Sequence, residues 1–194
     1  MSQSVSISRL QLISLSLLST GSLILTTFLP ALCPISSARA VEFPDGRVAF
    51  DRPPHLIRTA STSTKHRRAV VTYHFTIEVP EDAGEPLKAI EIEQPERSLK
   101  TIVFQPEATR AFLGNSFKGG PALSLATDET RVEPGKVTVV FDPPVPPGST
   151  ITIAIDPKRN PSRGGTYLFQ VTAFPAGEIR LGQSLGYGRL RIYD

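Results

Sequence analysis

Four segments of this chain alternate between apolar and polar residues, and this pattern constrains the fold more than any other feature. In residues 70–79 one face carries Val71, Tyr73, Phe75, Ile77 and Val79. A period of two over such a length is typical of a long antiparallel strand that buries one face. The same period recurs in residues 136–142, 151–155 and 167–173. The polar face of residues 70–79, which includes His74, is expected to face solvent.

Shorter segments with strand character lie between these four. They are residues 47–50, 56–60, 87–93, 101–104, 123–127 and 190–193. Turn sequences rich in glycine and proline separate them, and no segment has a sustained period of 3.6 residues. Residues 107–113 could form at most one short helical turn. The pattern predicts an all-β fold, a single β-sandwich of immunoglobulin-like architecture over residues 41–194, with an open barrel as the alternative.

The order of the strands along the chain also predicts which of them are neighbours. Consecutive strands often pair, so residues 137–141 are expected to pair with 151–155, and residues 71–79 with 87–93. The Cys-Trp-Cys hallmark of immunoglobulin domains is absent, because the chain has no tryptophan and its one cysteine is Cys33. "Immunoglobulin-like" therefore describes the expected architecture alone.

The amino-terminal segment is a long stretch without charge. Residues 10–38 contain no charged side chain and are flanked by Arg9 and Arg39. Arg9 is a short positive n-region, residues 10–32 are mostly apolar, and Ala38-Arg39-Ala40 is a small-x-small cleavage sequence. This pattern predicts a signal peptide over residues 1–40, cleaved between Ala40 and Val41. The protein is then exported to the periplasm, the cell envelope or the medium.

Two other interpretations of the leader stay open. Residues 10–32 are long enough for an uncleaved membrane anchor, which needs about 20 residues, although Gln11 and Pro30 interrupt them. The protein would then meet the membrane only through this segment. A lipoprotein would be modified at Cys33, although Leu32 stands where a small residue is needed.

Charge and cysteine content exclude several classes of protein. Because Cys33 lies in the leader, no disulfide and no cysteine-based zinc site is expected in residues 41–194. The leader holds two arginines and no acid, so its removal lowers the net charge from +3 to +1. Charges of both signs are scattered over the rest, which does not indicate a nucleic-acid partner. The domain must therefore be held together by its hydrophobic core alone. Residues 41–194 are enough to bury such a core.

Two basic loops offer the strongest binding signal. One runs from Lys65 to Arg68, and the other holds Arg159, Asn160 and Arg163, which are the predicted ligand residues. Guanidinium groups beside a turn-forming Asn-Pro could hold an acidic polysaccharide or a lipid phosphate, because arginine binds such groups through paired hydrogen bonds. The alternative is a charged surface loop balanced by Asp156 and other acids.

Metal and catalytic chemistry have weaker signals. His55, His66 and His74 could bind a metal only if the fold gathers them, and no cofactor is expected. Glu91 and Glu93 would lie about 6.6–6.8 Å apart on one strand face, a spacing close to that of glycosidase carboxylates. A solvated pair is the simpler interpretation, so no catalytic residue is assigned.

Turn and strand motifs occur along residues 41–194 in a distinctive combination. They are Phe43-Pro44-Asp45-Gly46-Arg47-Val48, Tyr73-x-Phe75-Thr76, Ala83-Gly84-Glu85-Pro86-Leu87, Phe141 to Gly148, and Gly165 to Gly177. With this combination the chain resembles an uncharacterised family of secreted cyanobacterial proteins, known only as a domain of unknown function. The resemblance implies an exported protein and supplies no activity and no catalytic residue.

Together these observations predict an exported, non-enzymatic β-sandwich that binds or organises a component of the cell envelope. The expected partner is an envelope polysaccharide or another envelope protein. An enzyme acting on envelope glycans and a periplasmic metal-binding protein remain as alternatives.

Overall fold

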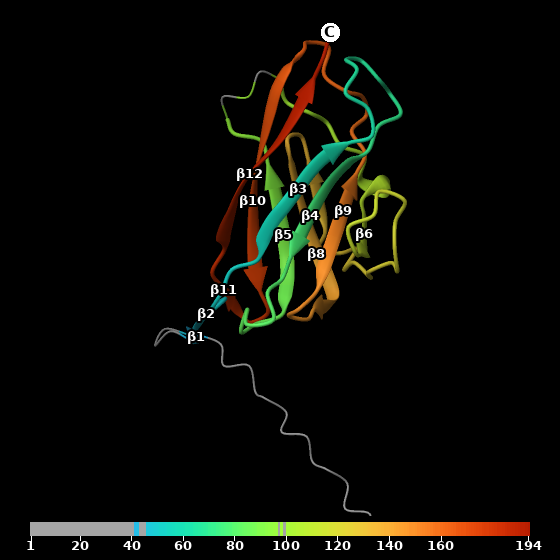
Figure 1. Cartoon of the computed structure of the whole chain (residues 1–194). Coiled ribbons are helices and arrows are strands. Elements are labelled where there is room, and N and C mark those ends of the chain that lie inside the picture. Colours follow the sequence, from blue (N-terminus) through green and yellow to red (C-terminus); the bar gives the residue numbers. More distant parts are fainter. Residues whose placement is uncertain (1–40, 43–45, 97, 99) are drawn as a thin grey trace, which may run out of the picture. The chain divides into compact units, whose positions relative to one another are not determined.

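The fold is built from β-strands (Figure 1). The computed structural model describes residues 41–42, 46–96, 98 and 100–194. The predicted signal peptide and the Ala40 side of its cleavage site lie outside these residues. In the described part of the chain the helical content is one 3-10 turn, η1 (Pro106–Ala108).

No helix in that part of the chain has the length and apolar character needed to cross a membrane.

Two antiparallel sheets carry most of the strands. The first has the order β12-β10-β5-β8-β7. Its strands are β5 (Leu87–Glu93), β7 (Arg131–Glu133), β8 (Lys136–Val145), β10 (Gly165–Pro175) and β12 (Gln183–Ile192). The second has the order β3-β4-β9-β6. Its strands are β3 (His55–Ser61), β4 (Tyr73–Glu78), β6 (Arg110–Leu113) and β9 (Thr150–Ile155).

A small third sheet has the order β1-β2-β11. Its strands are β1 (Val41–Glu42), β2 (Arg47–Ala49) and β11 (Ile179–Arg180). β1 pairs with β2 in antiparallel fashion, whereas β11 runs parallel to β2.

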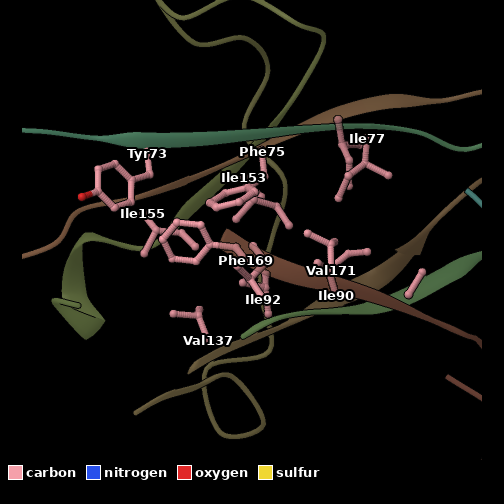
Figure 2. Close-up of a cluster of buried hydrophobic side chains, with 14 of the residues drawn as sticks. Tyr73, Phe75, Ile77, Ile90, Ile92, Val137, Ile153, Ile155, Phe169 and Val171 are labelled. Carbon is pink, nitrogen blue, oxygen red and sulfur yellow. The ribbon is translucent and has the colours of Figure 1, made fainter. Parts of the chain in front are cut away.

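The core lies between the two larger sheets, where the apolar faces of the alternating strands meet. Figure 2 shows Tyr73, Phe75 and Ile77 of β4 pointing toward side chains of the five-stranded sheet. The ring of Phe169 lies at the centre of the core. Its centroid is 5.5 Å from that of Phe75 and 6.0 Å from that of Tyr73, both in edge-to-face geometry. Phe75 and Phe169 are fully buried, as their alternation predicts. The arrangement confirms the all-β sandwich of immunoglobulin-like architecture.

The predicted strand pairs are wrong, because consecutive strands lie in different sheets. β8 pairs with β5 and β7, while β9 pairs with β4 and β6. Residues 146–149 carry the chain from one sheet to the other, and residues 79–86 do the same between β4 and β5. These two crossings are hydrogen-bonded to each other, since Val79 N–H donates to Ser149 O at 2.8 Å and Gly148 N–H donates to Val79 O at 2.9 Å.

His74 is buried, which corrects the prediction that it faces solvent. Its exposed fraction is 3%, and Thr76 and Thr152 on the same outer face of the four-stranded sheet have none. The β6–β7 connection, residues 114–130, covers this face. The Phe117 ring lies 4.9 Å from the His74 ring, and Thr152 Oγ1 donates to Gly114 O at 2.7 Å. The outer face of the four-stranded sheet, which carries these small polar residues, is therefore a second packed surface.

Two further local predictions need correction. Residues 107–113, expected as a helical turn, form only the end of η1 and then strand β6, which pairs with β9. Residues 101–104 and 123–127, expected as strands, make only isolated bridges, at Phe104 and Leu125. The predicted 190–193 strand is the end of the longer β12.

Candidate functional site

A pocket of about 320 Å³ opens beside the loop that joins β9 to β10. Arg67, Lys100, Lys158 and Arg159 supply its charged lining, and we call it the basic pocket. All four residues are exposed. Ile102 and Pro161 add buried apolar lining.

Three stretches of chain that are distant in sequence meet at this pocket. Lys158 N–H donates to Val103 O at 2.8 Å, which ties the β9–β10 loop to the segment before η1. Asn160 N–H donates to Arg68 O at 2.7 Å, and Arg67 N–H donates to Pro161 O at 3.0 Å. The two basic loops recognised in the sequence are thus hydrogen-bonded to each other.

Asn160 holds this junction together from inside. The residue has no exposed surface, and its Oδ1 accepts a 2.7 Å hydrogen bond from the Tyr73 hydroxyl. Its Nδ2 donates to Ser63 O at 3.0 Å and to Lys65 O at 2.8 Å. Burial, with a smaller contribution from Tyr167, raises the pKa of Tyr73, so its hydroxyl remains a proton donor at neutral pH. Asn160 therefore shapes the pocket by holding the surrounding loops in place. Its side-chain amide is already used in these hydrogen bonds.

The two predicted arginines have different positions. Arg159 lines the basic pocket, whereas Arg163 is exposed and outside its lining. The carbonyl of Arg163 accepts a 2.8 Å hydrogen bond from the Tyr167 hydroxyl. Lys100 is the lining cation that sequence reasoning missed, because it lies outside the two basic loops.

The charge of the basic pocket is not balanced locally. None of the described residues that line it is acidic. Within the described ranges the ion pairs join Arg52 to Asp82, Arg110 to Asp156, and Lys136 to Glu91 and Glu93, so none uses a cation of this pocket. Like charges that converge on a concave surface concentrate counter-ions there. The arrangement can attract and hold an anion.

The three histidines are not brought together. His55 pairs with Glu78 across β3 and β4, His66 contacts the carbonyl of Tyr193 at 3.2 Å, and His74 is buried beneath the β6–β7 connection. In the part of the chain that the structure describes, no group of three or more His, Cys, Asp or Glu residues could hold a metal ion.

The carboxylates of Glu91 and Glu93 share one partner. Lys136 Nζ lies 3.1 Å from Glu91 and 3.6 Å from Glu93. The hydrogen bond with Glu91, above all other causes, raises the pKa of Lys136. Both carboxylates are therefore ion-paired with the same ammonium group on the surface of the five-stranded sheet.

Comparisons with known proteins give a family and several structural likenesses. The sequence model described as "Protein of unknown function (DUF2808)" matches residues 47–192. No curated protein matches this chain.

Among solved structures, the chain is similar to the major pilin subunit BcpA of Bacillus cereus, with 12% identity and a TM-score of 0.48. That match covers 73% of this chain and only 40% of the pilin. The collagen-binding subdomain of the Enterococcus faecalis surface protein ACE has 10% identity and a TM-score of 0.42, covering 74% of this chain and 99% of that one. An uncharacterised immunoglobulin-like protein from Nocardia farcinica has 13% identity and a TM-score of 0.38, covering 71% and 99%.

Proposed function

Since the chain belongs to the DUF2808 family, whose description gives no activity, we propose a function from its site. The protein is an exported, non-enzymatic β-sandwich that binds an acidic polysaccharide of the cell envelope through the basic pocket. The observation that carries this proposal is the convergence of Arg67, Lys100, Lys158 and Arg159 on one concavity, where no described lining residue is acidic.

The geometry of the pocket suits a polymer with carboxylate or sulfate groups. Exposed arginine and lysine side chains at a rim can follow successive anionic groups, and arginine binds each through a planar fork. The exposed Val103 side chain in the lining can contact the face of a sugar ring. The predicted contribution of Arg163, outside the lining, extends the site along the same loop.

Export is part of the proposal. The uncharged residues 10–38 and the Ala38-Arg39-Ala40 sequence support a cleaved leader followed by one sandwich domain. The proposal includes the cyanobacterial source that the motif resemblance implies.

Retention on immobilised alginate, a polymer of carboxylated sugars, tests the binding. The wild type should be retained at low salt and released as salt is raised, because attraction between exposed charges is screened over about 10 Å at 0.1 M salt. Lys158→Ala with Arg159→Ala should weaken binding roughly tenfold. The melting temperature should not change, because the hydrogen bonds that fix this loop come from its backbone and from Asn160.

Arg131→Ala with Arg189→Ala is the matched control, since it removes two exposed cations that lie outside the basic pocket. This variant should be retained like the wild type. Arg163→Ala alone measures how far the site extends along the loop. Equal retention of the wild type and the Lys158/Arg159 variant would reject the basic pocket as the binding site.

A further inference from the structure

A second cavity lies on the outer face of the four-stranded sheet, beneath the β6–β7 connection. Its volume is about 580 Å³, and we call it the His74 cavity. His74 lines it from β4, Thr109 from the end of η1, Arg110 from the start of β6, and Phe117, Lys118 and Leu123 from the covering connection. Cavities of roughly 300–1,000 Å³ with a few polar groups on mostly apolar walls are the usual form of small-molecule sites.

Two polar atoms of this cavity are buried without a partner. His74 Nδ1 and Thr109 Oγ1 have no hydrogen bond to any described residue. His74 is 3% exposed, so solvent does not reach most of its ring. Unpartnered buried polar atoms are rare in native proteins, and each calls for an explanation. A ligand that offers hydrogen-bonding groups at this depth would satisfy both atoms.

The imidazole of His74 is suited to hydrogen bonding as a neutral group. Burial, followed by the nearby Arg110 and Arg58, lowers the pKa of His74, while Asp156 and the Thr72 backbone act in the opposite direction. A neutral imidazole presents one donor and one acceptor nitrogen.

Cations stand around the apolar walls of the same cavity. Arg110 lies 3.6 Å from Asp156, which is longer than a hydrogen bond, so its guanidinium keeps donors for another acceptor. The Arg110 side chain is 56% exposed. Arg58 stacks 4.2 Å above the half-exposed ring of Phe117, which itself contacts His74 edge-on. Arg110 and Phe117 thus line the same cavity, whereas Arg58 is linked to it through its contact with Phe117.

We propose that the His74 cavity binds an amphiphilic carboxylate, with an aromatic or aliphatic group against Phe117 and Leu123 and a carboxylate bound by Arg110. The inner polar groups of the ligand then reach His74 and Thr109. This inference goes beyond the alginate-type binding proposed above, because no described residue lines both the basic pocket and the His74 cavity.

Titration with N-acetyl-L-phenylalanine, followed by NMR of the histidine side chains, tests the proposal. The chain has three histidines, so the His74 signal can be assigned by comparison with His74→Gln. We expect saturable binding that shifts the His74 signal and leaves His55 unchanged. The uncharged N-acetyl-L-phenylalaninamide should bind about tenfold more weakly, since it lacks the carboxylate.

Two variants separate binding from folding. Thr109→Val keeps the shape of the side chain and removes only its hydroxyl, so binding should weaken about fivefold at an unchanged melting temperature. Ala122→Leu places a larger side chain into the cavity from its exposed wall and should abolish the titration. Lys158→Ala with Arg159→Ala is the control that should bind the probe like the wild type.

A pentapeptide ending in phenylalanine distinguishes the two sources of such a carboxylate. Binding comparable to that of N-acetyl-L-phenylalanine identifies a polypeptide terminus, and binding of the small acid alone identifies a free amphiphile. Failure of both probes to shift the His74 signal, or equal binding of acid and amide, would overturn the proposal. Unaltered titration of Ala122→Leu would place the probe elsewhere and overturn it as well.

Discussion

Neighbouring residues of β4 show how far an alternating pattern can be interpreted. Phe75 and His74 point to opposite faces of the four-stranded sheet, and both are buried. The sequence predicts the first correctly because large apolar residues at a period of two belong to a core. It does not predict the second, because polarity alone cannot tell a solvated face from one covered by a distant loop. The small uncharged Thr76, Thr152 and Ala154 on that face were the available signal.

Truncation of a central core ring should be costly. Phe169→Ala removes the ring that contacts Tyr73, Phe75 and Phe104, so the free energy of unfolding should fall by about 3–5 kcal/mol. Leu168→Ala, one residue earlier on the exposed face, should change it by no more than about 0.5 kcal/mol. Urea melts of both variants measure the difference, and similar losses would mean that the register of β10 differs from that described.

The buried histidine should make the protein sensitive to mild acid. Burial and the facing Arg110 and Arg58 lower the pKa of His74 in the folded state, against the opposing effect of Asp156. Between the folded pKa and the unfolded value near 6.5 the unfolded chain binds the extra proton. The contribution of neutral His74 to the free energy of unfolding is therefore complete above its unfolded-state pKa. It is lost as the pH falls through its folded-state pKa.

Urea melts of the wild type and His74→Gln at pH 7 and pH 5 measure this contribution. The wild type should lose more unfolding free energy between the two pH values than the variant, which has no imidazole to titrate. The other ionisable groups are the same in both proteins and serve as the control. A parallel decrease in the two proteins would contradict the assignment.

At the scale of elements, the sequence predicts the limits of a strand better than it predicts which strands pair with it. The predicted and observed limits of β5 are the same, residues 87–93. The pairing of strands was mispredicted because both sheets bury the same kind of alternating face, and the choice is made by the crossings at residues 79–86 and 146–149. β6 was missed because only Arg110–Leu113 belong to it, too few residues to establish a period.

The β6–β7 connection depends on a close approach at one glycine. A Cβ at Gly120 would overlap the carbonyl oxygen of Leu113, whose N–H donates to Pro121 O at 2.9 Å. Gly120→Ala should therefore push the connection away from β6 and weaken this hydrogen bond. Amide hydrogen exchange should become faster at Leu113 and Gly114, while amides of β5 in the other sheet stay protected. Unchanged exchange at Leu113 would show that the connection tolerates the added methyl group.

At the scale of the whole molecule, the fold joins loops that the sequence shows only as separate basic runs. Lys65 to Arg68 and Lys158 to Arg163 are more than eighty residues apart, yet backbone hydrogen bonds link them beside the basic pocket. Composition predicted the charge of these loops. Their meeting depends on the buried contact between Asn160 and Tyr73, which no local pattern reveals.

Processing of the amino terminus is the prediction that concerns the chain as a whole. If the protein is exported with cleavage after Ala40, amino-terminal sequencing of the exported species should begin Val41-Glu42-Phe43. Ala40→Leu should block this cleavage, because the site requires a small residue. An exported protein that still contains residues 10–32 would favour the membrane-anchor interpretation.

Pro161, which follows Asn160, affects the chemical stability of the hydrogen-bonded junction between the two basic loops. Asparagine side chains deamidate mainly when the backbone nitrogen of the next residue attacks the side-chain amide and closes a five-membered ring. Proline has no backbone N–H, so this ring closure is blocked at Asn160. Deamidation would place a carboxylate oxygen against the carbonyls of Ser63 and Lys65, which cannot donate to it. The proline that shapes the loop therefore also protects its central hydrogen bonds from the commonest spontaneous damage to asparagine.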